Sequence, residues 1–218
     1  DGGLLHFLDQ HDHRVGLLGN GDGDSLLHEG LAIGGDIHKA VKIGEAILLL
    51  RIQSLELDGV GKSEIDTGCG FLDHMLELFA HHGRFDLAVK CTGDTYVDFH
   101  HSVEDIGICL GQAFSKALGD AKGIYRYGNM ILPMDETLVI VALDLSGRAG
   151  LYYDVTPVAP MVSNFDARLF HEFFQSLCGR CGMNLHVKQL AAGENHHLFE
   201  GIFKAFAKAL DMATTYDE

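Results

Sequence analysis

His100-His101-Ser102-Val103-Glu104 starts one amphipathic stretch of this chain, and His196-His197-Leu198-Phe199-Glu200 starts a second one ninety-six residues later. The two stretches are closely similar and end at Leu118 and Leu210. On a helix, residues three and four positions apart share a face, so each glutamate is expected beside both imidazoles of its own motif. Imidazole nitrogens and carboxylate oxygens are good ligands for divalent transition metals. The repeat therefore predicts two metal-binding sets on matching helices, in preference to two coincidental pairs of histidines.

The composition excludes several classes of protein. The 218-residue chain carries 31 Asp and Glu against 16 Lys and Arg, a net charge of −15, which argues against nucleic acid or an anionic membrane as the main partner. No apolar run reaches the ~18 residues of a membrane span, and the N-terminal residues lack the pattern of a signal peptide. The five cysteines are scattered through apolar segments, as in a reducing compartment. We expect a soluble cytoplasmic protein.

Hydrophobic periodicity predicts alternating strands and helices from Ala46 onward. A strand-like run from Ala46 to Leu57 ends at the turn signal Asp58-Gly59. The patterns that follow predict helices over 71–79, 104–118, 167–178 and 200–210 and strands over 85–89, 129–133, 137–145 and 185–188.

The second half of the chain repeats the order of the first half. Superposing Leu87-Ala88-Val89-Lys90 on Leu185-His186-Val187-Lys188 needs a shift of ninety-eight residues. The same shift places His74 opposite Glu172, and both residues are potential metal ligands. The chain therefore reads as a duplicated unit in which each copy contributes one ligand from an early helix and one His-His-x-x-Glu set.

These patterns define the expected fold class and domain organisation. The fold class is α+β, an internally duplicated unit of antiparallel sheet with helices packed on one face. One domain is expected over 46–218, with two repeats at about 46–135 and 136–218. Residues 1–45 show no sustained periodicity and are expected to be an extension or a disordered segment.

Five stretches between about Asp58 and Ala213 carry a family resemblance. They are Thr67-Gly-Cys-Gly-Phe-Leu-Asp-His-Met-Leu76, Gly93-Asp-Thr-Tyr-Val-Asp-Phe-His-His-Ser-Val-Glu-Asp105, Pro133-Met-Asp-Glu136, Leu143-Asp-Leu-Ser-Gly-Arg148 and Gly193-Glu-Asn-His-His197. In this order they resemble imidazoleglycerol-phosphate dehydratase, the hydro-lyase of L-histidine biosynthesis that converts D-erythro-imidazole glycerol phosphate to imidazole acetol phosphate. The resemblance implies a duplicated α+β fold and a homo-oligomer, typically of 24 subunits, with a di-manganese site between subunits.

The resemblance also implies which residues hold the two Mn²⁺ ions of each active site. One ion would be held by His74, His101, His196 and Glu200, and the other by His100, Glu104, His197 and Glu172. Many relatives place His at position 172 in the order Glu-His, whereas this chain reads His171-Glu172. Successive residues point about 100° apart round a helix, so Glu172 is the ligand candidate and His171 is expected to be a surface or core histidine.

Substrate-binding residues follow from the same resemblance. Arg126, Arg148 and Lys204 match positions that face the phosphate, and His82 matches a position that contacts the substrate. Arg offers forked donors and Lys a point charge. A local basic cluster of this kind is expected because the chain as a whole is acidic.

One catalytic feature of the family is not found at its usual position. In the family a Glu shortly before the first long strand takes part in proton transfer, but the family register places Leu48 there. The nearest acid is Glu45, which is the catalytic candidate. A solvated acid at a strand edge is the alternative interpretation of Glu45.

Three functions remain open from the sequence. The first is an active dehydratase that binds the substrate ring as an imidazolate between two cations, which act as template and Lewis acids. The second is a metal-dependent hydrolase of another small phosphate ester on the same site. The third is a metal-binding relative without turnover, because the usual family Glu is absent.

Overall fold

The computed structural model describes residues 30–32, 39–41 and 49–217. Its helices are α1 Gly70–Gly83, α2 His100–Leu118, α3 Leu169–Cys181 and α4 Asn195–Thr214. Its strands are β1 Gly30–Ala32, β2 Lys39–Val41, β3 Leu49–Glu56, β4 Ser63–Asp66, β5 Asp86–Thr92, β6 Tyr127–Met134, β7 Thr137–Asp144, β8 Gly150–Asp154, β9 Met161–Val162, β10 Phe165–Asp166 and β11 Asn184–Ala191. The strands form one sheet of order β1-β2-β3-β5-β4, another of order β6-β7-β11-β8, and the hairpin β9-β10.

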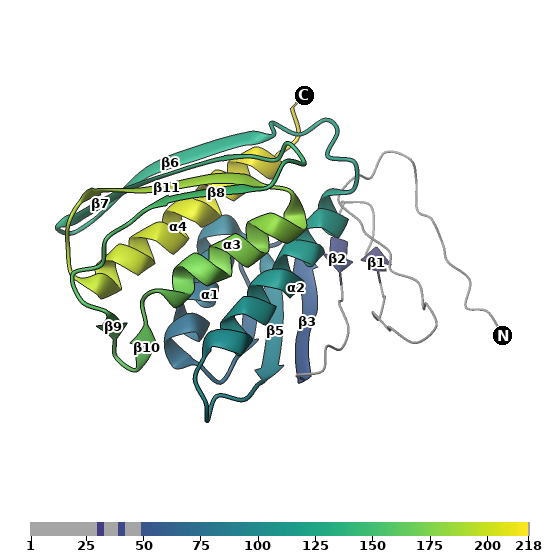
Figure 1. Cartoon of the computed structure of the whole chain (residues 1–218). Coiled ribbons are helices and arrows are strands. Elements are labelled where there is room, and N and C mark those ends of the chain that lie inside the picture. The colour runs from purple at the N-terminus through teal and green to yellow at the C-terminus, as the bar shows by residue number, and fades with distance from the viewer. Residues whose placement is uncertain (1–29, 33–38, 42–48, 218) are drawn as a thin grey trace.

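The helices form a layer between the two sheets (Figure 1). α1 and α2 pack on the first sheet, and α3 and α4 pack on the second. Within the layer, α2 packs against α3 and α1 against α4. Strand alternation explains the arrangement, because β5 buries Leu87, Val89 and Cys91 on the face that meets the helices. The expected α+β class, with helices on one face of each sheet, is confirmed.

The expectation of purely antiparallel sheets is wrong. β4 pairs with β5 in parallel, and β8 pairs with β11 in parallel. The reason is the connection between the strands of each pair, since α1 lies between β4 and β5 in the chain and α3 lies between β8 and β11. A helical crossover brings the chain back in its original direction, so the next strand runs parallel to the first.

Both halves of the described chain place their elements in the same order. The first half runs β2-β3-β4-α1-β5-α2, and the second runs β6-β7-β8-α3-β11-α4 with the hairpin β9-β10 inserted before α3. The sheet orders β2-β3-β5-β4 and β6-β7-β11-β8 match as well. The predicted boundaries at 45 and 135 stay predictions, and residue 45 lies outside the described residues.

Most of the predicted elements are confirmed, with ends that differ by a few residues. The helix predicted over 104–118 begins four residues earlier, at His100, and the helix predicted over 200–210 begins at Asn195. Both His-His motifs therefore lie inside the first turn of their helices. The patterns gave no indication of β4 and β8. β4 is too exposed to show alternation, because Ile65 is its one partly buried residue.

Two glycines allow α2 and α3 to approach closely. A Cβ added to Gly107 would lie 2.6 Å from the carbonyl oxygen of Phe173, and one added to Gly111 would lie 2.5 Å from that of Leu177. Both obstacles are backbone atoms of α3, so they cannot rotate away as a side chain could. The two helices can therefore pack this closely only because both positions are glycine, whose side chain is a single hydrogen atom.

We predict that Gly111→Ala destabilises the protein by about 1–3 kcal/mol, the usual cost of overpacking a well-packed contact. Gly179→Ala is the matched control, because Gly179 lies on an exposed face of α3 and an added Cβ meets nothing within 4 Å. This control should stabilise the protein by up to about 1 kcal/mol through helix propensity. Urea unfolding of both variants measures the difference, and equal effects would contradict the close-packing argument.

Candidate metal centre

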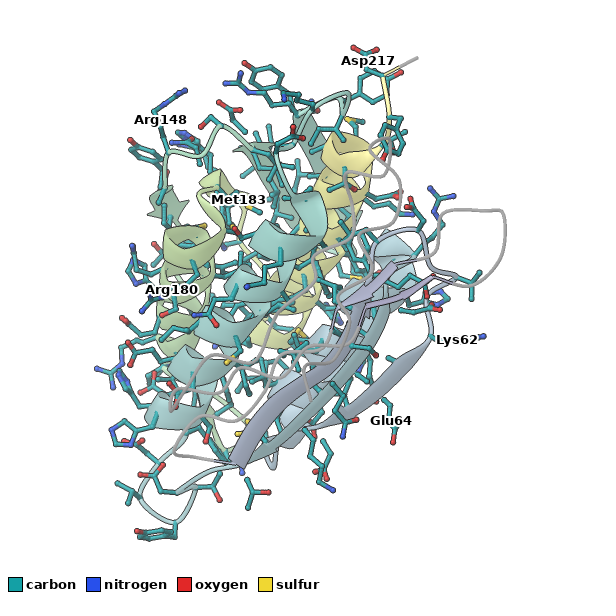
Figure 2. The ribbon with its side chains drawn as sticks, turned by 90° about the vertical axis from the view of Figure 1, so that its right-hand side faces the viewer. Lys62, Glu64, Arg148, Arg180, Met183 and Asp217 are labelled. Carbon is teal, nitrogen blue, oxygen red and sulfur yellow. The ribbon has the colours of Figure 1, made fainter. Side chains whose placement is uncertain are left out.

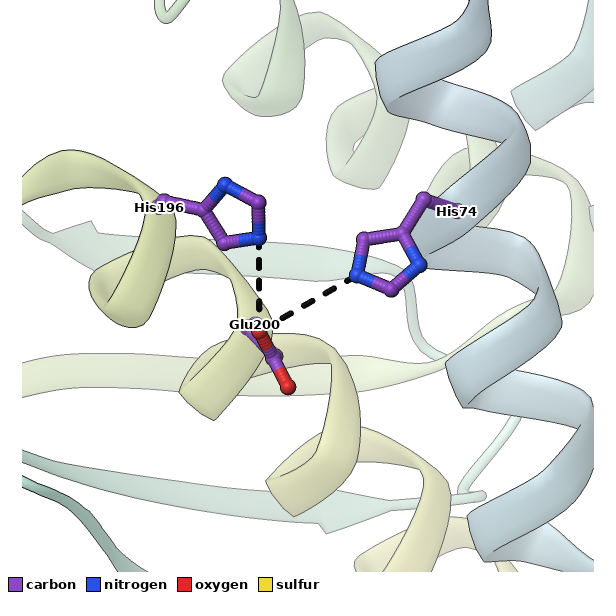
Figure 3. Close-up of side chains that lie close together, drawn as sticks. All are labelled: His74, His196 and Glu200. Atoms are coloured by element: carbon purple, nitrogen blue, oxygen red, sulfur yellow. Dashed lines mark ion pairs between the residues drawn. The ribbon is translucent and has the colours of Figure 1, made fainter.

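Three predicted ligands lie together where α1 meets α4. His74 comes from α1, and His196 and Glu200 come from the first two turns of α4 (Figure 3). Glu200 Oε2 lies 3.4 Å from His196 Nε2 and 4.0 Å from His74 Nε2. One ligand atom from each of these residues lies within 4.8 Å of the others, so a single cation could contact all three. We call this set the α1/α4 group.

Lys204 lies beside the α1/α4 group, one turn further along α4. Its Nζ is 2.6 Å from Glu200 Oε1, and both side chains are largely buried. Burial by itself would raise the pKa of Glu200, but the hydrogen bond from Lys204, the positive charge of Lys204 and the two nearby imidazoles together lower that pKa. Burial and then the positive charge of Lys204 lower the pKa of His82. The charge of Lys204 thus acts on His82, and the assignment of both as substrate-binding residues stays a prediction.

The second set of predicted ligands lies where α2 meets α3. His100 Nε2 is 3.8 Å from Glu104 Oε2 one turn along α2, and His100 lines a cavity of about 540 Å³ together with Glu172 of α3. We call His100, Glu104 and Glu172 the α2/α3 group. His171 Nδ1 lies 3.4 Å from Glu172, and its ring packs edge-on against Tyr153 at 5.6 Å. His171 is thus turned to a buried aromatic ring, whereas Glu172 faces the cavity.

The second histidine of each motif turns away from both groups. His101 Nδ1 lies 2.8 Å from Asp94 Oδ2, and His197 Nδ1 lies 3.2 Å from both carboxylate oxygens of Glu136. These hydrogen bonds raise the pKa of both imidazoles. The expectation that each glutamate lies beside both imidazoles of its motif therefore holds only for the first histidine. The physical reason is that a carboxylate from another segment holds the second one.

Asp94, Asp135 and Glu136 were missed as site residues by the sequence analysis. Ligand atoms of Asp135, Glu136 and His197 lie within 4.8 Å of one another. Glu136 also accepts the backbone N–H of Glu194 at 2.8 Å, where α4 begins. All three carboxylates lie inside the stretches that resemble the family, but their distance from the histidines in sequence gave no indication of a contact.

The predicted phosphate-binding arginines share one carboxylate at an end of β7. Arg126 donates to Asp144 through Nε at 2.6 Å and Nη2 at 3.1 Å, and Arg148 Nη2 lies 3.8 Å from the same side chain. Arg148 projects at the end of the molecule that also carries Asp217 (Figure 2). Arg126 N–H donates to Ala213 O near the end of α4, about two and a half turns from Lys204. Within one subunit the predicted phosphate ligands thus form two separate groups.

Glu45, the catalytic candidate, lies outside the described residues. Its assignment therefore stays a prediction. Among the helices that the structure describes, none has the length and apolar character needed to cross a bilayer.

Comparisons with known sequences agree on one family. The family model for Imidazoleglycerol-phosphate dehydratase matches residues 67–210. Enzymes of that name from Desulforamulus reducens and Acetivibrio thermocellus are 54% and 51% identical to the chain over 162 and 177 residues. The matched regions cover 74% and 81% of this chain and 83% and 89% of those proteins.

Solved structures give the same result. The imidazoleglycerol-phosphate dehydratase of Staphylococcus aureus superposes with a TM-score of 0.72 at 40% identity and covers 77% of this chain and 94% of its own. The Pyrococcus furiosus enzyme superposes with a TM-score of 0.68 at 36% identity, with coverages of 78% and 91%. Fold and sequence together define a hydro-lyase. The chain belongs to the imidazoleglycerol-phosphate dehydratase family, and its reaction is a step of histidine biosynthesis.

We predict that Asp144→Asn lowers stability at neutral pH and has little effect in acid. The Arg126 hydrogen bonds hold the pKa of Asp144 below its ordinary value of about 4. The ionised Asp144 therefore stabilises the fold at pH values above the ordinary pKa of about 4. This stabilisation is lost as the pH falls through the lowered pKa of the folded protein. Urea unfolding at pH 7 and at the lowest pH that retains the fold measures the change. Asp66→Asn, whose partner is the exposed Lys90, is the control.

Proposed function

We propose that this enzyme dehydrates D-erythro-imidazole glycerol phosphate to imidazole acetol phosphate at a di-manganese centre shared between subunits of a homo-oligomer. The proposal rests on how the predicted ligands are distributed within one subunit. The three members of the α1/α4 group lie within 4.8 Å of one another, and in the α2/α3 group His100 lies 3.8 Å from Glu104 and lines one cavity with Glu172. The fourth member of each predicted set contacts a carboxylate of its own. The outlying members are His101 for the α1/α4 group and His197 for the α2/α3 group. A neighbouring subunit would supply each missing ligand.

The chemistry of the donors fits manganese. Two imidazoles and one carboxylate make up the α1/α4 group, and these are ligand types that Mn²⁺ accepts. Two ions in each active site would act as template and Lewis acids for the imidazole ring of the substrate. Glu200 is kept ionised by Lys204, which leaves its second oxygen, 3.4 Å from His196, available as a ligand.

The remaining predicted residues bind the substrate in this proposal. Arg126, Arg148 and Lys204 would bind the phosphate, and each has a carboxylate partner within 4 Å, which lies at 2.6 Å for Arg126 and Lys204 and at 3.8 Å for the exposed Arg148. His82 is partly buried beside Lys204, and its lowered pKa keeps the imidazole neutral, so it can donate or accept a hydrogen bond at the substrate. Glu45 would move the proton that leaves the substrate carbon.

The assembly and the internal repeat belong to the same proposal. The matching element orders of the two halves support a duplicated unit over 46–218, with one half contributing α1 and α2 and the other α3 and α4. Each ligand group then combines one helix from each half. An assembly of 24 identical subunits is the expectation from the family, and it would close every active site across an interface.

Purified protein that has been stripped with chelator should form ketone from imidazole glycerol phosphate only after Mn²⁺ is added. Absorbance of the ketone product measures the reaction, and inorganic phosphate is assayed in parallel. Ketone without phosphate release identifies dehydration. Phosphate release instead would favour the hydrolase, and bound manganese without either product would favour a relative that lacks turnover.

We predict that two inactive variants restore each other when co-expressed. His196→Ala damages the α1/α4 group, and His101→Ala removes the ligand that we assign to a neighbouring subunit. In a mixed assembly, His101 of the first variant can complete the intact group of the second, so about a quarter of the sites should recover by random mixing. Separately purified and unmixed variants are the control. No recovery in assemblies shown to contain both chains would contradict sharing.

A further inference from the structure

Two carboxylates contact the outlying histidines in the same way. Asp94, in the loop after β5, lies 2.8 Å from Nδ1 of His101. Glu136, in the turn between β6 and β7, lies 3.2 Å from Nδ1 of His197. In both cases the ring nitrogen that faces the carboxylate is Nδ1, so the same atom, Nε2, is left for another partner.

The contact at Nδ1 determines what Nε2 can do. A neutral imidazole carries one N–H and one lone pair, and a carboxylate beside Nδ1 fixes the N–H there. The lone pair is then on Nε2, which is the atom that binds a metal. The carboxylate also restrains the ring orientation and makes Nε2 a better donor to a cation.

The internal repeat does not by itself produce these two contacts. The His-His motifs are ninety-six residues apart, but the residue ninety-six positions after Asp94 is Leu190, which has no carboxylate. Asp94 precedes its histidine by seven residues and Glu136 precedes its own by sixty-one. Two unrelated segments thus place a carboxylate at Nδ1 of the second histidine. We infer that this histidine needs a carboxylate at Nδ1 for its role, because the internal repeat does not produce the contact.

Local structure accounts for these carboxylates only in part. Glu136 also accepts the N–H of Glu194 at the start of α4, so it has one structural task. Asp94 makes no corresponding bond, because its Oδ1 is buried without a hydrogen-bond partner among the described residues. A buried carboxylate oxygen without a partner is costly. The contact between Oδ2 and His101 is therefore what remains to explain the position of Asp94.

We propose that Asp94 and Glu136 are positioning residues that hold His101 and His197 with Nδ1–H toward the carboxylate and with Nε2 directed to metal ions completed by a neighbouring subunit. The proposal rests on the shared di-manganese centre described above. Two further carboxylate oxygens approach His197 Nε2, from Asp135 at 3.8 Å and Glu194 at 3.9 Å. Both distances exceed that of a hydrogen bond, so Nε2 of His197 remains available.

The test is a Mn²⁺ titration of the assembled protein, with the unbound ion measured by electron paramagnetic resonance. Asp94→Ala should weaken one of the two bound equivalents by about 10–100-fold and leave the other at its wild-type affinity. Glu136→Ala should do the same to the other equivalent. The double variant should weaken both equivalents. These readouts need no turnover, so they are independent of activity.

Two conservative variants separate positioning from a purely structural role. Glu136→Gln keeps an oxygen that can accept the N–H of Glu194, and Asp94→Asn keeps the shape of the loop side chain. If the carboxylate acts through the imidazole, each should still lose part of the affinity of its own equivalent, because the negative charge at Nδ1 is gone. A role confined to folding predicts that both variants keep wild-type affinity.

Asp154→Asn is the matched control, since it removes an exposed carboxylate on β8 whose partner is Lys188 at 2.8 Å and not His101 or His197. It should change neither Mn²⁺ affinity. The proposal is overturned if the alanine variants assemble normally and bind both ions as the wild type does, or if each weakens both equivalents alike. Failure of the shared centre itself would be visible separately, as a wild-type protein that binds no manganese.

Discussion

Packing of phenylalanine rings between the helices and sheets is the constraint on which both ligand groups depend. Phe71 of α1 packs edge-on against His196 at 5.3 Å and against Phe170 of α3 at 5.8 Å. Phe165 lies 5.9 Å from Phe71 and stacks at 6.3 Å on Phe99, the residue that precedes His100. One apolar cluster therefore contacts the α1/α4 group on one side and the start of α2 on the other. Because buried aromatic rings contribute large apolar areas, the positions of both groups are set by the core itself.

Pairing of opposite charges holds the predicted phosphate-binding cations of this acidic chain in place. The chain has a net charge of −15, yet Lys204 and Arg126 each have a carboxylate within 2.6 Å. These pairs restrain the two side chains, so in the proposed function less side-chain entropy would be lost when they bind the substrate. In the proposed di-manganese centre the same acidic residues would serve a second purpose, because two divalent cations need nearby negative charge. Glu200 combines both purposes, since one oxygen contacts Lys204 and the other faces the two imidazoles of its group.

Hydrophobic periodicity predicts the helices of this chain but not its parallel edge strands. Helices of this chain bury one face along consecutive turns, so the periodicity of α2 and α4 is visible in local sequence. β4 and β8 are edge strands of the described sheets, and each pairs only with a strand that follows in the chain after a helix. Their pairing is long-range, and the exposure of β4 leaves no alternating pattern in that strand.

Local sequence spacing was enough to predict which residues share a helix face. The spacing of four places His100 beside Glu104 and His196 beside Glu200, and both contacts are present. Which helices contact each other, and which way the second histidines point, depend on the tertiary structure. The packing of α1 against α4 brings His74 close to His196 and Glu200. Because neighbouring residues point about 100° apart on a helix, His101 and His197 cannot follow their partners into the same group. Carboxylates from outside the two helices, Asp94 and Glu136, then contact these histidines, and the helical spacing does not predict such contacts.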